Sequence, residues 1–241
     1  MLSRMMAHAE DVLRAPSAEA ASVGFFRGVR RLGASYLQTR VYRRPTGPLT
    51  SASHWAAGGF VKRIARKGWE DSTAFNFVCF ECNPLLAAIR EGRTRYRFSD
   101  FAPRASPAFA DYWSALGEAG IGDALCATSY GDGSLVASLH LGFPENDFSA
   151  DESLGLQLAG LVLTERLISL AKPSSNPPVQ LTRRERDSLA FVAEGKTDWE
   201  ISVILGVSEA TARFHVDNAR RKLGAVNRAQ AVARMVYQRL V

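Results

Sequence analysis

Arginine side chains recur along one short segment near the C-terminus, and their spacing suits contact with nucleic acid. Residues three and four apart lie on one face of a helix, so a helical segment would present them together. A guanidinium near the start of such a helix can donate two hydrogen bonds to guanine O6 and N7 in the major groove. Arg213 is therefore the predicted base-reading residue. The outward face consists of Arg213, Asp217, Arg220 and Arg221.

Neighbouring donors are suited to phosphate oxygens, and such contacts set the register of a protein on DNA without reading its sequence. The predicted DNA-binding set adds Lys196, Ser208, Thr211, His215, Asn218 and Lys222. Two plainer interpretations stay open. His215 is equally well explained as a half-buried packing residue, and the whole segment as a packed helical unit whose charges are only solvated.

Capping signals divide this segment into helices. Residues 182–185 and 197–200 each place a threonine three residues before a glutamate, a spacing at which the two side chains satisfy each other's free backbone amides. Gly195 and Gly206 tolerate the left-handed conformation in which helices end. Ser208 then opens a third helix. A helix, a short turn and a second helix therefore follow one another, which is a helix-turn-helix.

The third and fourth helices have apolar faces of their own. The buried stripe predicted for the third helix consists of Ala212, Val216, Ala219 and Leu223. The fourth helix, capped by Asn227, is expected to pair with a symmetry mate. The residues of that predicted contact are Ala229, Val232, Ala233 and Val236. The sequence thus predicts a homodimer.

Residues 181–241 resemble the LuxR-type helix-turn-helix. The matching positions are Leu181–Arg186, Gly195–Thr197, Glu200–Ile201, Leu205–Ser208, His215, Asn218–Ala219, Lys222–Gly224 and Asn227–Arg228. Ala212 departs from the family, which usually has a larger aliphatic residue there. The resemblance implies double-stranded promoter DNA as a partner, and RNA polymerase as a second one. It places DNA contacts at Lys196, Thr211, Arg213, His215 and Lys222, and roles in folding and activation at Glu185, Leu189 and Gly195.

Length and composition suit two globular domains. The chain has 241 residues, 46% of them hydrophobic and 22% charged, whereas domains most often hold about 100–150 residues. Proline and small polar residues at 172–178 mark a linker, which gives domains at 1–172 and 181–241 joined by residues 173–180. The first residues lack the apolar core of a secretory signal. We expect no membrane span and a cytoplasmic location.

The net charge of +6 is unevenly spread. Residues 1–70 hold 12 Lys and Arg against 4 Asp and Glu, residues 71–172 hold 7 against 13, and residues 173–241 hold 11 against 7. The basic C-terminal part fits nucleic-acid binding. The basic N-terminal stretch is predicted to be a solvated face, and contact with DNA, a partner protein or the acidic middle segment stays open. Its residues are Arg27, Arg30, Arg31, Arg40, Arg43, Arg44, Lys62, Arg63, Arg66 and Lys67.

An antiparallel hairpin is the clearest element before the linker. A tight-turn pair at residues 132–133 and the alternation that follows it predict two strands within Ala124–Phe143. Further strands are predicted over Ser35–Arg43 and Phe60–Arg66. The predicted helices are Ser22–Gly33, Ser72–Phe80, Pro84–Glu91, Pro107–Glu118 and Ala150–Leu170. Helices on both faces of a small antiparallel sheet make an α-β-α sandwich, so the expected fold is α/β with an all-α C-terminal domain.

The middle of the chain resembles the autoinducer-binding domain of LuxR-type regulators over Asn83–Leu86 and Tyr96–Phe101. In that family the first of these positions is usually an aspartate, which accepts a hydrogen bond from the amide of an acyl-homoserine lactone. An asparagine oxygen still accepts that bond, but without charge. The position of Phe98 is usually a tryptophan. The resemblance implies an acyl- or aryl-homoserine lactone, or a related amphiphile, as the small-molecule signal.

The same resemblance assigns residues to the ligand. Trp69 would contact the lactone, and Ser138 would bond the ligand's carbonyl, although an ordinary strand serine explains Ser138 as well. The predicted ligand-binding residues are Trp69, Phe75, Asn83, Tyr96, Phe98, Trp113 and Ser138. Tyr130 is a further candidate for an aromatic wall.

Other chemistry finds little support in the sequence. Three cysteines, an odd number, argue against a disulfide framework. Cys79 and Cys82 have the C-x-x-C spacing, but no second pair completes a zinc site, so core packing is predicted for them and for Cys126. No nucleophile and base, phosphate loop or metal cluster indicates an enzyme. No cofactor is expected.

These observations lead to one hypothesis and one alternative. The hypothesis is a homodimeric DNA-binding transcriptional regulator, controlled by a small molecule in its N-terminal domain. The alternative is a ligand-independent regulator of the same type, whose N-terminal domain serves only dimerisation or protein interaction.

Overall fold

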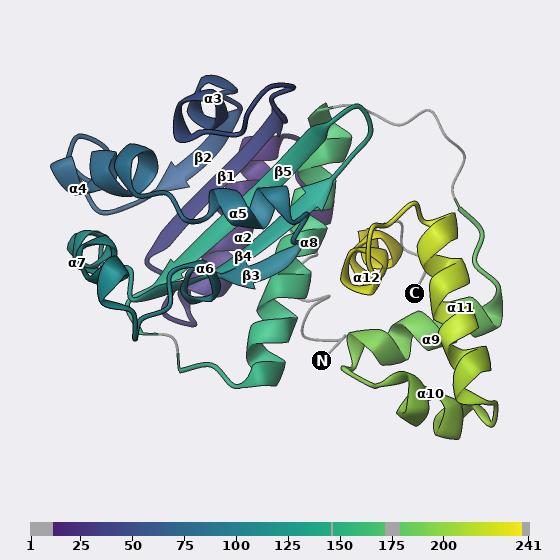
Figure 1. Ribbon diagram of the computed structural model, residues 1–241. Coiled ribbons are helices and arrows are strands. Elements are labelled where there is room, and N and C mark those ends of the chain that lie inside the picture. Colours follow the sequence, from purple (N-terminus) through teal and green to yellow (C-terminus); the bar gives the residue numbers. More distant parts are fainter. Residues whose placement is uncertain (1–11, 146, 172–178, 238–241) are drawn as a thin grey trace.

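The computed structural model describes residues 12–145, 147–171 and 179–237. A five-stranded sheet has helices on both faces, and a helical module follows it (Figure 1). The strand order is β2-β1-β5-β4-β3, and every neighbouring pair is antiparallel. The predicted sandwich and all-α C-terminal domain are confirmed. Most of the predicted linker, residues 173–178, lies outside the described residues.

Register within the sheet decides which side chains share a face. The strands are β1 (Tyr36–Arg43), β2 (Phe60–Ile64), β3 (Arg95–Arg97), β4 (Asp123–Tyr130) and β5 (Leu135–Phe143). Arg40 pairs with Ser138, and Ser138 pairs with Thr128, so the three residues form one row across β1, β5 and β4. Side chains alternate along each strand, so the row faces one side. The predicted turn between β4 and β5 is present, and Gly133 there has a φ of 62°.

One face of the sheet is apolar and lies against two helices (Figure 1). They are α2 (Ala18–Arg30) and α8 (Ala150–Ala171). A Cβ added to Gly160 of α8 would lie 2.8 Å from Leu139 Cδ2 and 3.0 Å from Ala127 Cβ. Only a glycine therefore lets the helix axis come this close to the strands.

Helix α8 is the one described helix that is long and apolar enough to cross a membrane by length and composition alone. Its most apolar 18-residue window has a mean hydropathy of 1.4, and 61% of that window is buried inside the protein. Leu158, Leu161 and Leu163 are among its fully buried side chains. Because a helix that is buried on most sides is apolar all round, its position between the sheet and the C-terminal module explains its composition.

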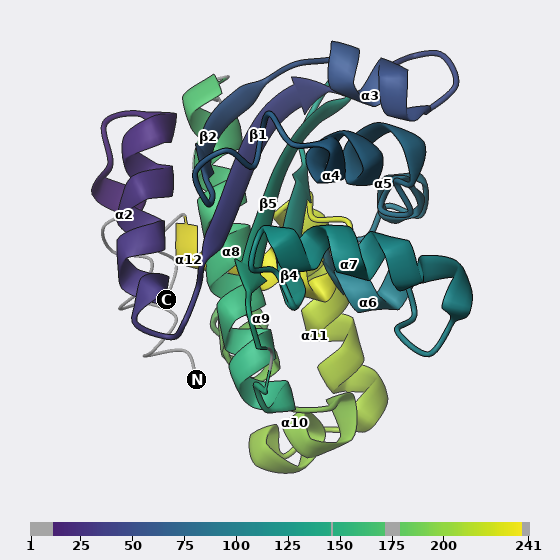
Figure 2. The same cartoon turned by 90° about the vertical axis from the view of Figure 1, so that its left-hand side faces the viewer.

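Short helices cover the other face of the sheet (Figure 2). They are α3 (Ser51–Ala56), α4 (Thr73–Asn76), the π-helix η1 (Phe77–Glu81), α5 (Leu86–Arg90), α6 (Phe98–Phe101), the 3-10 helix η2 (Pro107–Phe109) and α7 (Ala110–Glu118). A second core cluster lies under them and is rich in aromatic side chains, including Tyr36, Trp69, Tyr96, Phe98 and Tyr112. This layer is less regular than the opposite one and encloses a cavity.

The C-terminal helices begin and end where the sequence predicts. They are α9 (Arg183–Ala193), α10 (Asp198–Leu205), α11 (Glu209–Lys222) and α12 (Arg228–Tyr237). Both capping boxes are present: the backbone N–H of Thr182 donates to Glu185 at 2.8 Å, and that of Thr197 donates to Glu200 at 2.8 Å. Gly206 ends α10 with a φ of 65°. Each predicted signal therefore acts locally, as capping does.

The prediction that the apolar face of α12 pairs with a symmetry mate is wrong for this arrangement. Helix α12 lies between α8 and α9, and its buried residues include Ala229, Val232, Ala233 and Val236. Val232, Ala233 and Val236 have no exposed surface within a single chain. The N-terminal domain itself therefore occupies the face that the sequence assigned to a second copy.

Short elements escaped prediction in the N-terminal domain. The sequence patterns predict neither α3, α6 nor β3, which are six, four and three residues long. Hydrophobic periodicity needs windows of about 11–18 residues to be informative. The predicted helix Ser72–Phe80 is divided between α4 and η1.

Candidate functional site

A cavity of about 70 Å³ lies between the sheet and the short helices α3 to α7. Six of the seven predicted ligand residues line it together: Trp69, Phe75, Asn83, Tyr96, Phe98 and Ser138. Trp113 does not line it, because its indole N–H donates to the carbonyl of Ala102 and Arg104 lies 3.9 Å over its ring. Tyr130 is also outside the lining, and its hydroxyl donates to the carbonyl of Arg93. The structure therefore does not place Trp113 and Tyr130 in the wall of this cavity.

Aromatic rings form much of the cavity wall. Trp69 meets Phe75 edge-on at a centroid distance of 5.8 Å, and Phe75 in turn meets Trp55 at 5.6 Å. Trp55, on α3, was not predicted to line the cavity. Edge-to-face pairs of this kind hold rings in fixed orientations, so the apolar part of the site is preformed.

A hydrogen bond to the backbone fixes the orientation of the Asn83 side chain. Its side-chain nitrogen donates to the carbonyl oxygen of Cys79 at 3.1 Å. The amide group therefore presents its oxygen, an uncharged acceptor, on the remaining side. Cys79 itself is half-buried and lines the cavity, and burial raises the pKa of its thiol to about 12, so the thiol stays protonated.

His140 and Tyr96 form a buried polar pair in the wall. The Tyr96 hydroxyl lies 3.1 Å from His140 Nε2, and Phe98 meets the imidazole edge-on at 5.2 Å. Burial, and then the positive charge of Arg40, lower the pKa of His140 to about 4. His140 is therefore neutral near pH 7.

Arg40 corrects the prediction of a solvated basic face. Its side chain is fully buried, with 1% of the residue exposed, and it lines the cavity. Arg63 is also largely covered, because it lies 2.7 Å from Glu70 and 4.7 Å over the ring of Phe60. These two arginines come to the cavity side because β1 and β2 place them in the second core layer. Sequence composition carries no signal for that placement.

The outward side of α11 is the candidate nucleic-acid face. Ala212, Val216 and Ala219 are buried as predicted, whereas Arg213 and Phe214 are exposed. Phe214 is 57% exposed and was not singled out from the sequence. An apolar ring on an otherwise polar outward face was the available signal, since apolar side chains contact thymine methyl groups in the major groove.

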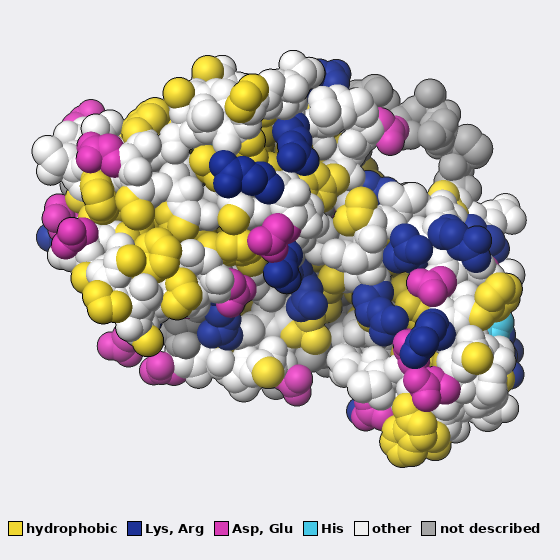
Figure 3. All heavy atoms as spheres, viewed as in Figure 1, with side chains coloured by type: hydrophobic (Ala, Val, Ile, Leu, Met, Phe, Trp, Pro, Cys, Tyr) yellow, Lys and Arg dark blue, Asp and Glu magenta, His cyan; other side chains and the backbone are white. Residues whose placement is uncertain are grey.

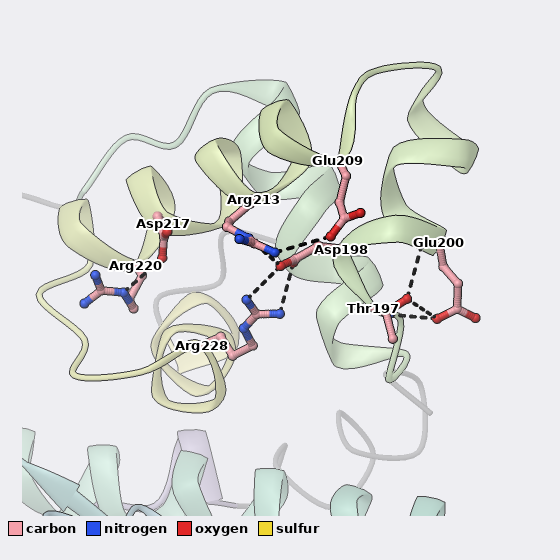
Figure 4. Close-up of polar contacts among 8 residues, drawn as sticks. All are labelled: Thr197, Asp198, Glu200, Glu209, Arg213, Asp217, Arg220 and Arg228. Carbon is pink, nitrogen blue, oxygen red and sulfur yellow. Dashed lines mark hydrogen bonds and ion pairs between the residues drawn. The ribbon is translucent and has the colours of Figure 1, made fainter.

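Arg213, the predicted base reader, is held by two carboxylates in this structure (Figure 4). Its Nε lies 3.2 Å from Asp198 on α10, and its Nη2 lies 3.3 Å from Glu209 on its own helix. Arg228 approaches the same Asp198 at 3.1 Å from the start of α12. Asp198 thus joins α10, α11 and α12. Partial burial works to raise the pKa of Asp198, but hydrogen bonds and the charges of Arg228 and Arg213 lower it overall.

The predicted phosphate-contacting residues also have partners within the module. Lys222 lies 2.8 Å from the nearly buried Glu185, and Lys196 lies 3.7 Å from Glu200. The Ser208 hydroxyl caps α11 by accepting from the N–H of Thr211 at 3.1 Å. The remaining residues behave as follows: Asn218 accepts a hydrogen bond from Arg221, and His215 is half-buried beside the ring of Phe214.

The surface of the module is mixed rather than uniformly basic. Figure 3 shows Lys and Arg side chains interspersed with Asp and Glu over the C-terminal helices, in the lower right of the view. Exposed ion pairs contribute little to stability, about 0–1 kcal/mol each. Lys196, whose partner Glu200 is partly exposed, can therefore exchange that carboxylate for a phosphate at small cost.

Buried polar contacts join the two domains. Glu165 of α8 accepts from Gln230 Nε2 at 2.7 Å and from Arg234 Nε at 3.0 Å. Arg234 also donates to the carbonyl of Tyr130 at 3.1 Å, and Asn227 donates to Thr94 at 2.6 Å. Glu165 is 6% exposed. The interface is therefore built from matched donors and acceptors as well as apolar contacts.

Comparisons with known proteins agree with this architecture. Residues 179–235 match the family of bacterial regulatory proteins called the luxR family. The transcriptional activator protein BjaR1 of Bradyrhizobium diazoefficiens is 26% identical over 76% of this chain and 77% of that protein. The quorum sensing-dependent regulator RpaR of Rhodopseudomonas palustris is 39% identical over 46% of this chain, and the chain spans less than half of that protein, 45%.

Among solved structures, Escherichia coli SdiA is similar with a TM-score of 0.49 and 22% identity, over 99% of this chain and 98% of SdiA. The LuxR-type match rests on the C-terminal helices, and the fold upstream of them is read from the structure itself. The C-terminal helices of the chain thus match the luxR family of bacterial regulatory proteins, and its relatives include transcriptional activators and regulators.

Proposed function

We propose that this chain is a cytoplasmic, homodimeric regulator that binds a pseudo-palindromic promoter site and responds to a small molecule held in its N-terminal cavity. The observation that carries the proposal is α11, which is capped by Ser208, buries Ala212, Val216 and Ala219, and exposes Arg213 and Phe214. A helix with those two faces fits the major groove. Two-fold symmetry of the protein predicts the palindrome.

The proposed division of the chain follows the fold. Residues 1–172 sense the ligand and dimerise, residues 173–180 link, and residues 181–241 bind DNA. Within the last part, Arg213 exchanges its carboxylate partners for a base edge. The phosphate-contacting and capping residues are Lys196, Ser208, Thr211, His215, Asn218 and Lys222. RNA polymerase is the proposed second macromolecular partner.

The proposed dimer contact lies outside the apolar face of α12 while that helix is docked. Val232, Ala233 and Val236 are covered by the chain's own domains, so a symmetry mate has no access to them. Pairing through the N-terminal domain, or through α12 after it has left α8, satisfies this constraint. We propose that ligand binding stabilises the dimer and raises DNA affinity by linkage.

Fluorescence anisotropy with the full chain tests the DNA-binding part. The probes are double-stranded fragments selected by the protein from a random library. Arg213→Ala should cost about 1–3 kcal/mol at one base position and relax specificity there, whereas Lys196→Ala should weaken binding across sequences and reduce its salt dependence. The control is Arg183→Ala, because that side chain is 94% exposed at the start of α9.

Equal effects of Arg213→Ala and Lys196→Ala at every position would contradict the division of roles. Absence of salt-sensitive binding to any selected duplex would contradict DNA binding itself.

A ligand-independent regulator is the second candidate, because Asn83 and Phe98 depart from the residues usual in the family. Native mass spectrometry of the purified protein distinguishes the two. A bound small molecule, or a thermal shift with N-octanoyl-homoserine lactone or an aryl analogue, supports the sensor. If no added or co-purified molecule binds while DNA binding persists, the N-terminal domain serves dimerisation or protein interaction alone.

A further inference from the structure

The cavity encloses a positive charge that no carboxylate of the described residues balances. Arg40 is fully buried in its wall, and no Asp or Glu lines the cavity among the residues that the structure describes. The other arginine nearby, Arg63, has its own partner in Glu70 at 2.7 Å. Buried charges are normally paired, because moving an ion out of water is costly. Within the described part of the chain, the cavity therefore lacks a negative group.

The guanidinium of Arg40 is held in place without being neutralised. Its Nη2 donates to the carbonyls of Gly58 at 2.6 Å and His54 at 2.9 Å, and its Nε donates to Gly58 at 3.1 Å. The rings of Tyr42 and Phe60 lie 4.5 and 4.6 Å from its central carbon. These contacts fix the position of the group, but every one of them is made to a neutral partner.

The contact between Arg40 and His54 also sets the tautomer of the histidine. Arg40 Nη1 lies 2.6 Å from His54 Nε2, and an arginine nitrogen can only donate. Nε2 therefore accepts, and the ring proton sits on Nδ1. Burial, and then the charges of Arg40 and His140, lower the pKa of His54 to about 3, so the ring is neutral near pH 7. Its Nδ1–H is a buried donor with no acceptor among the described residues.

Two hydroxyl groups of the cavity wall are unpartnered in the same way. Tyr42 Oη and Thr128 Oγ1 are buried and have no hydrogen-bond partner within the described part of the chain. Of the four such side-chain atoms found there, three belong to residues that line this one cavity. Unsatisfied buried polar groups are rare in folded proteins and call for an explanation. Here they are all able to donate, and they share a wall with a guanidinium.

The sheet places three of these donors, Arg40, Tyr42 and Thr128, on one side of the cavity. Arg40, Ser138 and Thr128 form a single row across β1, β5 and β4, and Tyr42 follows Arg40 two residues further along β1. His54 meets the ring of Tyr42 edge-on at 5.1 Å. The aromatic wall of Trp69 and Phe75 belongs to the helical layer. The site thus combines the donors of the sheet, with His54 of α3 beside Tyr42, and the aromatic rings of the helical layer.

We propose that the cavity binds a small organic acid, whose ionised oxygen group meets Arg40, Tyr42, His54 and Thr128, and whose aromatic or short aliphatic body packs against Trp69 and Phe75. Charge-assisted hydrogen bonds to a carboxylate are about twice as strong as those to a neutral carbonyl. Asn83, where the resembling family usually carries an aspartate, adds no negative charge that would repel such a group. The inference rests on the proposed role of the cavity as the signal site.

Matched acids and esters test this with the full-length protein. Isothermal titration and thermal shift are measured with phenylacetate against methyl phenylacetate, and with octanoate against methyl octanoate. Each acid is expected to bind at least about tenfold more tightly than its ester, a factor that corresponds to about 1.4 kcal/mol. N-octanoyl-homoserine lactone serves as the neutral reference of the proposed function.

Two variants of Arg40 test whether this residue causes the preference for the acid over the ester. Arg40→Gln should abolish the difference between acid and ester, and Arg40→Lys should retain part of it. Arg63→Gln is the matched control, because Arg63 also lies over the ring of Phe60 but is already paired with Glu70, so the preference should persist. The wild-type comparison stands without the variants if Arg40→Gln does not fold.

Equal binding of acid and ester, failure of both acids to bind, or an unchanged preference in folded Arg40→Gln would each overturn the inference. Binding of the lactone without either acid overturns the inference and leaves the proposed sensor intact. If the protein binds none of these molecules and none co-purifies, the sensor proposal fails with it.

Discussion

The polar groups of the C-terminal module are paired within the chain, whereas several buried polar groups of the cavity wall have no partner among the described residues. In the module each capping hydroxyl and each of the ion pairs around Asp198 and Glu185 finds its complement within the chain. In the cavity, the described residues provide no carboxylate for Arg40 and no hydrogen-bond partner for the buried hydroxyls of Tyr42 and Thr128. A region whose donors and acceptors are paired within the chain needs no external hydrogen-bond partner. A region with unpaired buried donors is stabilised when a bound molecule supplies the missing acceptors.

Glu165 is where the complemented arrangement should be most costly to break. Glu165→Ala leaves Arg234 and Gln230 without their buried acceptor, and removing one member of a buried ion pair costs about 3–5 kcal/mol. Urea denaturation of the full chain measures the loss. The control is Glu209→Ala, whose side chain is 49% exposed and whose loss should cost no more than about 1 kcal/mol. Similar losses for the two variants would show that the interface between α8 and α12 is not specially dependent on this pair.

Removing an unpartnered cavity hydroxyl should have the opposite sign. Thr128→Val keeps the shape of the side chain, and Tyr42→Phe keeps the ring, while each removes a buried group that has no acceptor in the described chain. We expect the ligand-free protein to gain about 1–3 kcal/mol per hydroxyl, the desolvation penalty of an unsatisfied group. The measurement is the free energy of unfolding before and after addition of phenylacetate. A destabilised ligand-free protein would mean that these hydroxyls are already satisfied.

Capping provides a smaller and purely local test. Thr182→Ala removes the hydroxyl that accepts from the N–H of Glu185 at 3.3 Å, and the loss of such a cap typically costs about 0.5–2 kcal/mol. Thr182→Ser, which keeps the hydroxyl, is the matched control and should behave like the wild type. Thermal unfolding followed by circular dichroism compares the two. An unaffected alanine variant would show that α9 is held by packing alone.

Acid titration of Asp198 should give the smallest effect. Its pKa is lowered from the usual 3.8 in the folded protein, with partial burial opposing Arg228 and Arg213. The stabilisation is therefore complete above pH 4 and is lost as the pH falls through the lowered folded pKa. The melting temperature of the wild type should exceed that of Asp198→Asn above pH 4, and the two should converge as the pH falls through the lowered folded pKa of Asp198. A difference that does not change with pH would mean that the amide replaces the carboxylate fully.

Prediction from sequence succeeded where the determining contacts are local. The caps at Thr182 and Thr197 and the glycine at Gly206 lie within a few residues of the groups they satisfy. The turn at residues 132–133 is equally local. Six of the predicted ligand residues were brought to one cavity, because the family resemblance supplied long-range information that periodicity lacks.

Prediction failed for residues whose burial or contact partner is set by a segment that is distant in the sequence. Arg40 looks like the other arginines of a basic stretch, and only its place on β1 beneath α3 buries it. The sequence predicts Trp113 in the cavity wall, but in the structure its indole N–H donates to the carbonyl of Ala102. Periodicity identifies an apolar face on α12 without saying which surface covers it.

Short-range physics therefore let the amino-acid sequence alone determine the four C-terminal helices, their caps, the hairpin and the exposed side of α11, because each depends on hydrogen bonds and side-chain spacing within one element. Tertiary structure alone decided that Arg40 lies in the cavity, that three donors there lack acceptors among the residues that the structure describes, and that α8 covers α12. The reason is that the burial and pairing of a residue depend on its contact partner, and the partners in these contacts are distant in the chain.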